Sequence, residues 1–197
     1  MQRCVLIGAL GLLLTAGACK QESRTDRATD STATSAPTDT PTGPAPLTDR
    51  LTALGLTTDS DWRGISLGDR LTKVKATETG ERFEEDAQHV GYAVEFPNLE
   101  SMDVLYRQYN GNVLWIEIDL YLNDAKSVET YTNELTNYFN WRYGKPEIAK
   151  VNTMWIDKRA GEERAYFFMK DASKGKDFGL KIKIMPADLP KTTASAR

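Results

Sequence analysis

Hydrophobic and polar residues alternate along several stretches of this chain, and a period of two is typical of a β-strand that buries one face. The stretches that show it are residues 89–96, 102–109, 113–122, 151–157, 165–170 and 178–185. In the last stretch Leu180, Ile182 and Ile184 alternate with two lysines. This pattern predicts a strand with one buried face and one face that the lysines keep in solvent.

The longest helix is predicted at residues 124–143, where hydrophobic residues recur at a spacing of three or four. We expect Asn123 to cap its N-terminus, and Gly144 followed by Pro146 to end it. Its predicted buried stripe consists of Val128, Tyr131, Leu135, Tyr138 and Phe139.

Two shorter helices are predicted nearer the N-terminus. In the first, residues 48–54, Thr48 is the expected N-cap and Gly55 closes the last turn. In the second, residues 70–77, Asp69 is the expected N-cap because its side-chain oxygens can accept bonds from the free N–H groups of the first turn.

The segment Asn110-Gly111-Asn112 predicts a turn between two of the strands. A two-residue turn would pair Tyr106 with Trp115 and mix apolar with charged side chains. A three-residue turn with Gly111 in left-handed geometry pairs Tyr106 with Ile116 instead, and a register that collects the apolar residues is the favourable one. We therefore predict the three-residue turn and a buried face of Met102, Val104, Tyr106, Ile116, Ile118, Leu120 and Leu122.

The order of the longer elements is helix, three strands, helix, three strands. Neither group of strands can bury its sheet face alone, so this order predicts an α+β fold with an antiparallel sheet and helices packed on one face. The sheet is either continuous or divided between two αβββ units.

Residues Ile65–Val74 (ISLGDRLTKV) are similar to the start of a helix in the SmpA/OmlA (BamE-like) lipoproteins and in the related β-lactamase-inhibitor-like repeats. Tyr143-Gly-Lys-Pro146 is similar to the Leu-Gly-x-Pro that closes the first helix of those families. Their members are small lipid-anchored or secreted α+β modules that bind other proteins. The resemblance implies a fold and a binding role, and it carries over no functional residue.

Residues 1–18 predict a signal peptide: Arg3 is followed by a short apolar run, which is too short to span a bilayer. The segment Leu14–Cys19 resembles the lipobox of bacterial lipoproteins. The resemblance implies that Cys19 carries a diacylglyceryl thioether and an N-acyl chain, which anchor the protein in a membrane. Lys20 follows the cysteine; an Asp at that place favours the inner membrane in enteric-type lipoproteins, so we expect the outer membrane.

Residues 19–47 are rich in Thr, Pro, Ser, Ala and Asp, which predicts a disordered tether after the lipidated cysteine. Within it, Asp30-Ser31-Thr32 resembles an acceptor for bacterial O-glycosylation. One globular domain is predicted at residues 48–190, and a disordered tail at residues 191–197.

The composition excludes several classes of function. The chain has 25 Lys+Arg against 28 Asp+Glu, which argues against a nucleic-acid partner. It has one histidine, His89, and two cysteines, Cys4 and Cys19, so zinc sites of the Cys/His type and cysteine nucleophiles are not expected. The segment Asp59–Gly64 begins like a calcium loop but has Arg63 where a ligand is needed. No cofactor, metal ligand or catalytic residue is therefore predicted.

Two further polar features are given structural interpretations. The acidic run Glu81, Glu84, Glu85 and Asp86 is predicted to lie on a solvated loop. His89, at the start of a strand, is interpreted as a structural or surface histidine.

The candidate binding face is the side of the strand 113–122 that points away from the predicted core. It consists of Trp115, Glu117, Asp119 and Tyr121, together with Arg107 on the neighbouring strand. The predicted register places Arg107 opposite Trp115 and Asp103 opposite Asp119. Aromatic residues beside carboxylates suit a partner surface, a sugar platform or a cation site between the two aspartates. The alternative is a solvated sheet face with Arg107 stacked on Trp115.

These observations predict a lipid-anchored, non-enzymatic protein of the cell envelope that binds a protein partner. A lipoprotein that binds a small ligand such as a carbohydrate is the alternative interpretation. A hydrolase that uses two carboxylates is a third, because that chemistry needs only a spatial arrangement.

Overall fold

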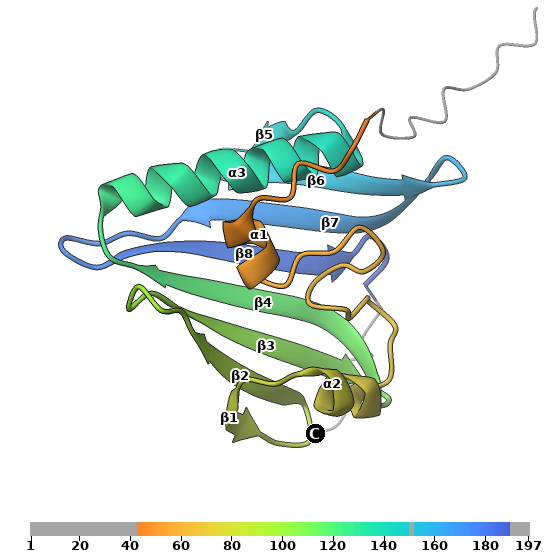
Figure 1. Ribbon diagram of the computed structural model, residues 1–197. Helices are drawn as coiled ribbons and strands as arrows, with labels where there is room; N and C mark the ends of the chain where they lie inside the picture. Colours follow the sequence, from red (N-terminus) through yellow and green to blue (C-terminus); the bar gives the residue numbers. More distant parts are fainter. Residues whose placement is uncertain (1–42, 150–151, 190–197) are drawn as a thin grey trace, which may run out of the picture. The chain divides into compact units, whose positions relative to one another are not determined.

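Eight strands form one antiparallel sheet in the order β1-β2-β3-β4-β8-β7-β6-β5 (Figure 1). The computed structural model describes residues 43–149 and 152–189. Strands β1 to β4 form one meander and β5 to β8 a second, and the two meanders join where β4 pairs with β8. The strands are β1 (Glu81–Glu85), β2 (His89–Glu95), β3 (Ser101–Tyr109), β4 (Asn112–Leu122), β5 (Glu147–Ala149), β6 (Asn152–Arg159), β7 (Glu162–Asp171) and β8 (Phe178–Pro186).

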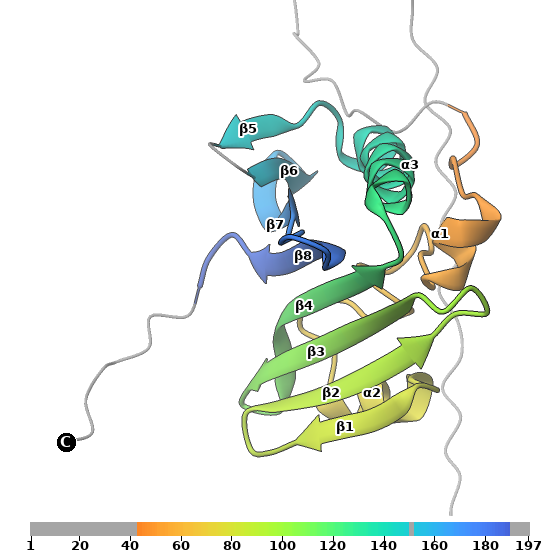
Figure 2. The same cartoon turned by 90° about the vertical axis from the view of Figure 1, so that its left-hand side faces the viewer.

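Three helices lie on one face of this sheet (Figures 1 and 2). They are α1 (Asp49–Ala53), α2 (Leu71–Thr77) and α3 (Ala125–Tyr143). Their apolar residues share one core with alternate residues of the inner strands β2, β3, β4, β7 and β8, and with Trp155 of β6. The predicted antiparallel sheet with helices on one face is therefore present as a single continuous sheet, and strands rather than helices dominate the structure.

The core follows the predicted alternation closely. Ile116, Ile118 and Leu120 of β4 pair with Ile184, Ile182 and Leu180 of β8, and all six side chains are buried. Burial of one such side chain contributes roughly 1.5–3 kcal/mol, so this central seam is a major source of stability. The buried stripe of α3 is also as predicted: Val128, Tyr131, Leu135, Tyr138 and Phe139.

Two strands were not expected. The acidic run at residues 81–85 is strand β1 rather than a loop, and residues 147–149 form strand β5. Each meander therefore has four strands and not three. All five residues of β1 are exposed, so the strand lacks the alternation that would have predicted it.

The helix caps differ in part from the expectation. Thr48 caps α1 by accepting a hydrogen bond from Leu51 N, as predicted. Helix α3 is capped by Asp124 and not by Asn123. Helix α2 has no side-chain cap; Asp69 instead accepts a bond from the backbone N–H of Ser66, so the segment before α2 folds back on itself.

The hairpin between β3 and β4 has the predicted register, with Tyr106 opposite Ile116 and Arg107 opposite Trp115. The predicted three-residue turn is wrong. Asn110 and Gly111 both have positive φ, at 52° and 78°, which is the geometry of a two-residue type I′ turn. A β-bulge restores the register, because Leu114 has no partner on β3.

The predicted signal peptide, Cys19, most of the tether and the tail at 191–197 lie outside the described residues. The end of the predicted tether is described, and there Gly43 O accepts a hydrogen bond from Trp141 Nε1 of α3 at 3.2 Å. Within residues 43–149 and 152–189, none of the helices combines the length and the apolar character that crossing a bilayer requires.

Gly111→Ala should destabilise the fold by about 1–2 kcal/mol, because an L side chain is strained at positive φ. Chemical denaturation of the variant measures this loss. Asn112→Ala, one residue further on at the start of β4, is the control and should change stability by no more than about 0.5 kcal/mol. Equal stability of Gly111→Ala and the wild type would contradict the assigned turn.

Candidate functional site

The candidate functional surface is the face of the sheet opposite the helices. Side chains that alternate with the core residues of the strands point to it. Among the described residues no helix covers this face, which we call the open face (Figure 2). All five residues of the predicted binding face lie on it: Arg107 on β3, and Trp115, Glu117, Asp119 and Tyr121 on β4.

Half-buried apolar side chains cover the open face over β6, β7 and β8. Cross-strand pairing sets Met154 opposite Phe168, Ile156 opposite Tyr166, and Tyr166 opposite Met185. We call these five residues the apolar stripe. The pairing of Ile116 with Ile184 brings the neighbouring Trp115 to the end of the stripe. The alternation of β4 predicted that Trp115 lies on the open face. The apolar stripe was not predicted, because the sequence did not show how β6, β7 and β8 are ordered relative to β4.

Ion pairs fill the part of the open face over β3, β4 and β8. Glu117 lies between two cations, with Oε1 3.1 Å from Lys183 Nζ and Oε2 3.4 Å from Arg107 Nε. Burial alone would raise the pKa of Glu117, but the hydrogen bond and charge of Lys183, together with Arg107, outweigh it and lower the pKa. Asp119 Oδ1 lies 3.0 Å from Lys181 Nζ. The carboxylates of β4 are therefore neutralised by neighbouring strands.

Trp115 has a cation on each of two neighbouring strands. The guanidinium carbon of Arg107 lies 5.9 Å from the centroid of its ring, and Lys183 Nζ lies 4.9 Å from it. The predicted stacking of Arg107 on Trp115 is confirmed. Each such contact contributes about 0.5–1 kcal/mol at an exposed site. Because Glu117 binds the same two cations, Arg107, Trp115, Glu117 and Lys183 form one connected cluster.

Asp103 and Asp119 face each other across β3 and β4, as the register predicted. Tyr121 Oη donates a hydrogen bond to Asp103 Oδ2 at 3.1 Å, while Lys181 pairs with Asp119. Burial raises the pKa of Tyr121 to about 12, and the charges of Asp103 and Asp119 act in the same direction. A hydroxyl and an ammonium group thus accommodate both carboxylates. In the described part of the chain no three side chains of His, Cys, Asp or Glu gather in a way that could hold a metal ion.

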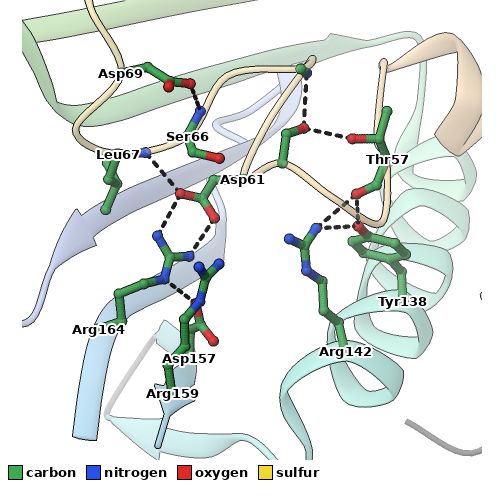
Figure 3. A network of polar contacts seen from close by, with 12 residues as sticks. Thr57, Asp61, Ser66, Leu67, Asp69, Tyr138, Arg142, Asp157, Arg159 and Arg164 are labelled. Atoms are coloured by element: carbon green, nitrogen blue, oxygen red, sulfur yellow. Dashed lines mark hydrogen bonds and ion pairs between the residues drawn. The ribbon is translucent and has the colours of Figure 1, made fainter. Parts of the chain in front are cut away.

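A buried polar network on the helix side of the sheet was not predicted (Figure 3). Arg164 binds both carboxylate oxygens of Asp61, with Nη1 2.9 Å from Oδ2, and its Nε donates to Asp157. Asp61 is fully buried and also accepts a bond from Leu67 N at 2.9 Å. Burial alone would lower the pKa of Arg164, but the hydrogen bonds and charges of Asp61 and Asp157 raise it.

A second β-bulge places Arg164 in this network. Asp157 pairs with Ala165 and Lys158 with Glu163, so Arg164 has no partner on β6. Without the bulge, Arg164 would alternate with the buried Ala165 and point to the open face. The bulge turns the side chain of Arg164 to the helix side of the sheet. There Arg164 holds the loop that carries Asp61.

Two smaller networks tie the same loop to the core. On α3, Arg142 Nη1 and Tyr138 Oη both donate to the carbonyl of Thr57, at 2.8 and 2.7 Å (Figure 3). On the other side of the loop, Arg63 binds the carboxylate of Glu78 at 3.0 and 2.9 Å. Arg63 thus forms a structural ion pair with a carboxylate, whereas Arg142 binds a backbone carbonyl.

His89 is buried on β2, between Glu84 and Asp86. Its Nε2 lies 2.7 Å from Glu84 Oε1 and its Nδ1 lies 3.0 Å from Asp86 Oδ1. His89 thus contacts two members of the acidic run, and its place beside an edge strand fits the structural interpretation.

A scan against protein-family models, a search of curated proteins and a search of solved structures each returned no match. The resemblance of residues 65–74 to the BamE-like lipoproteins, and that of residues 14–19 to a lipobox, therefore stay predictions.

Arg164→Met should lower the free energy of unfolding by about 3–5 kcal/mol, because it leaves the buried carboxylate of Asp61 without its cation. Lys181→Met is the matched control, since it also removes the cation that pairs with an aspartate, here Asp119. Asp119 is partly exposed, so the control should cost no more than about 1 kcal/mol. Denaturant titration distinguishes the two, and equal losses would contradict the structural role of the Asp61–Arg164 pair.

Proposed function

We propose that this chain is a lipid-anchored, non-enzymatic protein of the cell envelope and that its open face binds a protein partner. The lipid on Cys19 holds the chain at the outer membrane of a cell with two membranes. The tether at residues 19–47 then sets the reach of the domain from that membrane.

The observation that carries the proposal is the difference between the two faces of the sheet. One face is covered by three helices, whereas the other holds the apolar stripe, Trp115 and the ion-pair cluster (Figure 2). Aromatic residues, methionine and arginine are enriched at protein interfaces, and contiguous exposed apolar patches are typical of binding sites. A partner protein whose surface combines apolar and charged groups would match this face.

Five carboxylates of the open face and of the buried network support a binding role over a catalytic one. The carboxylates of Asp61, Asp157 and Glu78 are bound by arginines, and those of Glu117 and Asp119 by lysines. A general base or nucleophile needs a free carboxylate near a substrate. Carboxylates held in ion pairs serve stability and the shape of the surface instead.

A small-ligand receptor is the second candidate, and one feature favours it. A cleft of about 440 Å³ lies beside Tyr121 and is lined by Asp119, Lys170 and Lys181. Hydroxyl, carboxylate and ammonium groups around a cleft suit a polar ligand such as a sugar. A ligand-induced increase in the unfolding temperature, lost in Tyr121→Ala, would favour this alternative over a protein partner.

Cys19→Ser should move the chain from the membrane fraction to the soluble fraction, because the variant has no thiol for the lipid. Intact-mass measurement of the wild type should show the added acyl groups, and cleavage before Cys19. A serine variant that stays with the membrane, or a wild-type chain without lipid mass, would contradict the anchor.

Trp115→Ala combined with Tyr121→Ala should weaken partner binding at least tenfold, which corresponds to about 1.4 kcal/mol. The partner is first captured by crosslinking from envelope fractions and then purified, so that titration calorimetry gives a dissociation constant for each variant.

The matched control is Leu99→Ala with Ile148→Ala, which removes two highly exposed hydrophobic side chains outside the open face. It should leave the affinity unchanged, and thermal unfolding verifies that both double variants are folded. Equal affinities for the two double variants would contradict a binding role for the open face.

A further inference from the structure

A pocket of about 540 Å³ lies at the end of the open face beside Trp115, where the β1–β2 turn and the β3–β4 turn lie side by side (Figure 2). Gln108 links the two turns. Its backbone N–H donates to the carbonyl of Gln88 at 2.8 Å, and its side-chain amide donates to the carbonyl of Ala87. Its side-chain oxygen accepts a bond from Gly111 N at 2.7 Å. These bonds hold the walls together, so the pocket is formed before any ligand binds.

The β-bulge of β4 brings two consecutive side chains to this pocket. Leu114 and Trp115 both line it, although they lie between two buried residues of the core, Val113 and Ile116. Strict alternation would place only one of two consecutive residues on the open face. The bulge therefore adds an aliphatic side chain to the indole ring. Tyr109, about half exposed at the end of β3, adds a second aromatic ring.

Arg107 is the only charged side chain among the residues that line the pocket. Its Nε lies 3.4 Å from Glu117 Oε2, and 34% of its side chain is exposed. Within residues 43–149 and 152–189, no acceptor forms a hydrogen bond with its Nη1 or Nη2. The N–H groups at this end of the guanidinium are therefore available to a ligand.

The acidic groups of the neighbouring β1–β2 hairpin are bound elsewhere and do not line the pocket. Asp86 Oδ1 accepts bonds from the backbone N–H groups of Gln88 and His89, at 2.6 and 2.9 Å. Glu84 Oε1 lies 2.7 Å from His89 Nε2. The pocket thus presents one cation in a lining that is otherwise apolar, aromatic or amide.

We propose that this pocket binds a small carboxylic acid with an apolar or aromatic body. A guanidinium group pairs with a carboxylate through two parallel N–H···O bonds, and Nη1 and Nη2 of Arg107 are free to form them. The apolar body of the ligand lies against Leu114 and Trp115. A preformed, mostly apolar pocket with few polar groups is typical of small-molecule sites. A ligand with an ammonium group would meet Arg107 without an anion to pair with.

This site goes beyond the binding of a protein partner and does not rest on it. The pocket also shares no residue with the cleft beside Tyr121. A carboxylic acid bound at Arg107 and Trp115 therefore occupies only one end of the open face.

Three probes with the same body and different head groups test the charge preference: 4-phenylbutyrate, 4-phenylbutanol and 4-phenylbutylamine. They are titrated into the ¹⁵N-labelled full chain with Cys19→Ser, which removes the need for detergent, and N–H resonances report binding. We expect the acid to bind about tenfold more tightly than the alcohol, which lacks the charge-assisted bonds to Arg107, and the amine to bind most weakly. The indole N–H resonance of Trp115 should shift with the acid. Equal affinities of the three probes, or acid binding that leaves this resonance unchanged, would overturn the proposal.

Arg107→Gln should lower the affinity for the acid to that for the alcohol. Lys181→Gln is the matched control, because it removes another cation of the open face that does not line the pocket. It should leave the preference for the acid unchanged, and thermal unfolding verifies that each variant is folded. Retention of the preference in Arg107→Gln, or an equal loss in Lys181→Gln, would contradict the assigned role of Arg107.

Gln88→Glu gives a second test that leaves Arg107 in place. Gln88 is exposed and lines the pocket, so the isosteric change adds a negative charge to its wall without disturbing the core. The affinity for the acid should fall several-fold, while that for the alcohol stays the same. Equal affinities of the acid for the wild type and for Gln88→Glu would contradict this site.

Tyr121→Ala separates this pocket from the cleft on the other part of the open face. The variant should bind the acid as tightly as the wild type, and a loss of binding would move the acid to that cleft and overturn the proposal. The probe titration needs no protein partner. Its failure therefore leaves the partner titration intact, and a failed partner titration leaves the probe titration intact.

Discussion

The antiparallel pairing of β4 with β8 is the contact on which the rest of this structure depends. It joins the two four-stranded meanders into one sheet with one shared core. One register satisfies both faces: isoleucines and leucines meet under the helices, while Glu117 meets Lys183 and Asp119 meets Lys181 on the open face. A slip by one residue would expose the apolar residues and bury the charges, so both faces specify the same alignment.

Most of the core could be predicted because alternation is strong wherever a strand buries one face. The register of β3 with β4 followed from the apolar residues alone, yet the turn that produces it did not. A three-residue turn and a two-residue turn with a bulge at Leu114 give the same pairing of Tyr106 with Ile116. The pattern of side chains determines which residues pair, whereas the backbone conformation of Asn110 and Gly111 determines the type of turn.

The missed features share a physical cause, since each depends on contacts that no local pattern records. Strand β1 lies at the edge of the sheet with every side chain exposed, so it has no alternation to detect. Arg164 and Asp61 are 103 residues apart, and the bulge that turns Arg164 inward is visible only in the pairing of β6 with β7. The open face was predicted in part because Trp115 and Tyr121 alternate with core residues, while the apolar stripe required the strand order.

The central claim is that the uncovered face of the sheet is the surface that meets a partner in the envelope. Hydroxyl-radical footprinting of the chain in intact envelopes, compared with the purified protein, tests it directly. The account predicts that Tyr121 and Phe168 on the open face are labelled several-fold less in envelopes, whereas Leu99 and Ile148, exposed outside that face, are labelled equally. Equal labelling of Tyr121 and Phe168 in both preparations would contradict the claim.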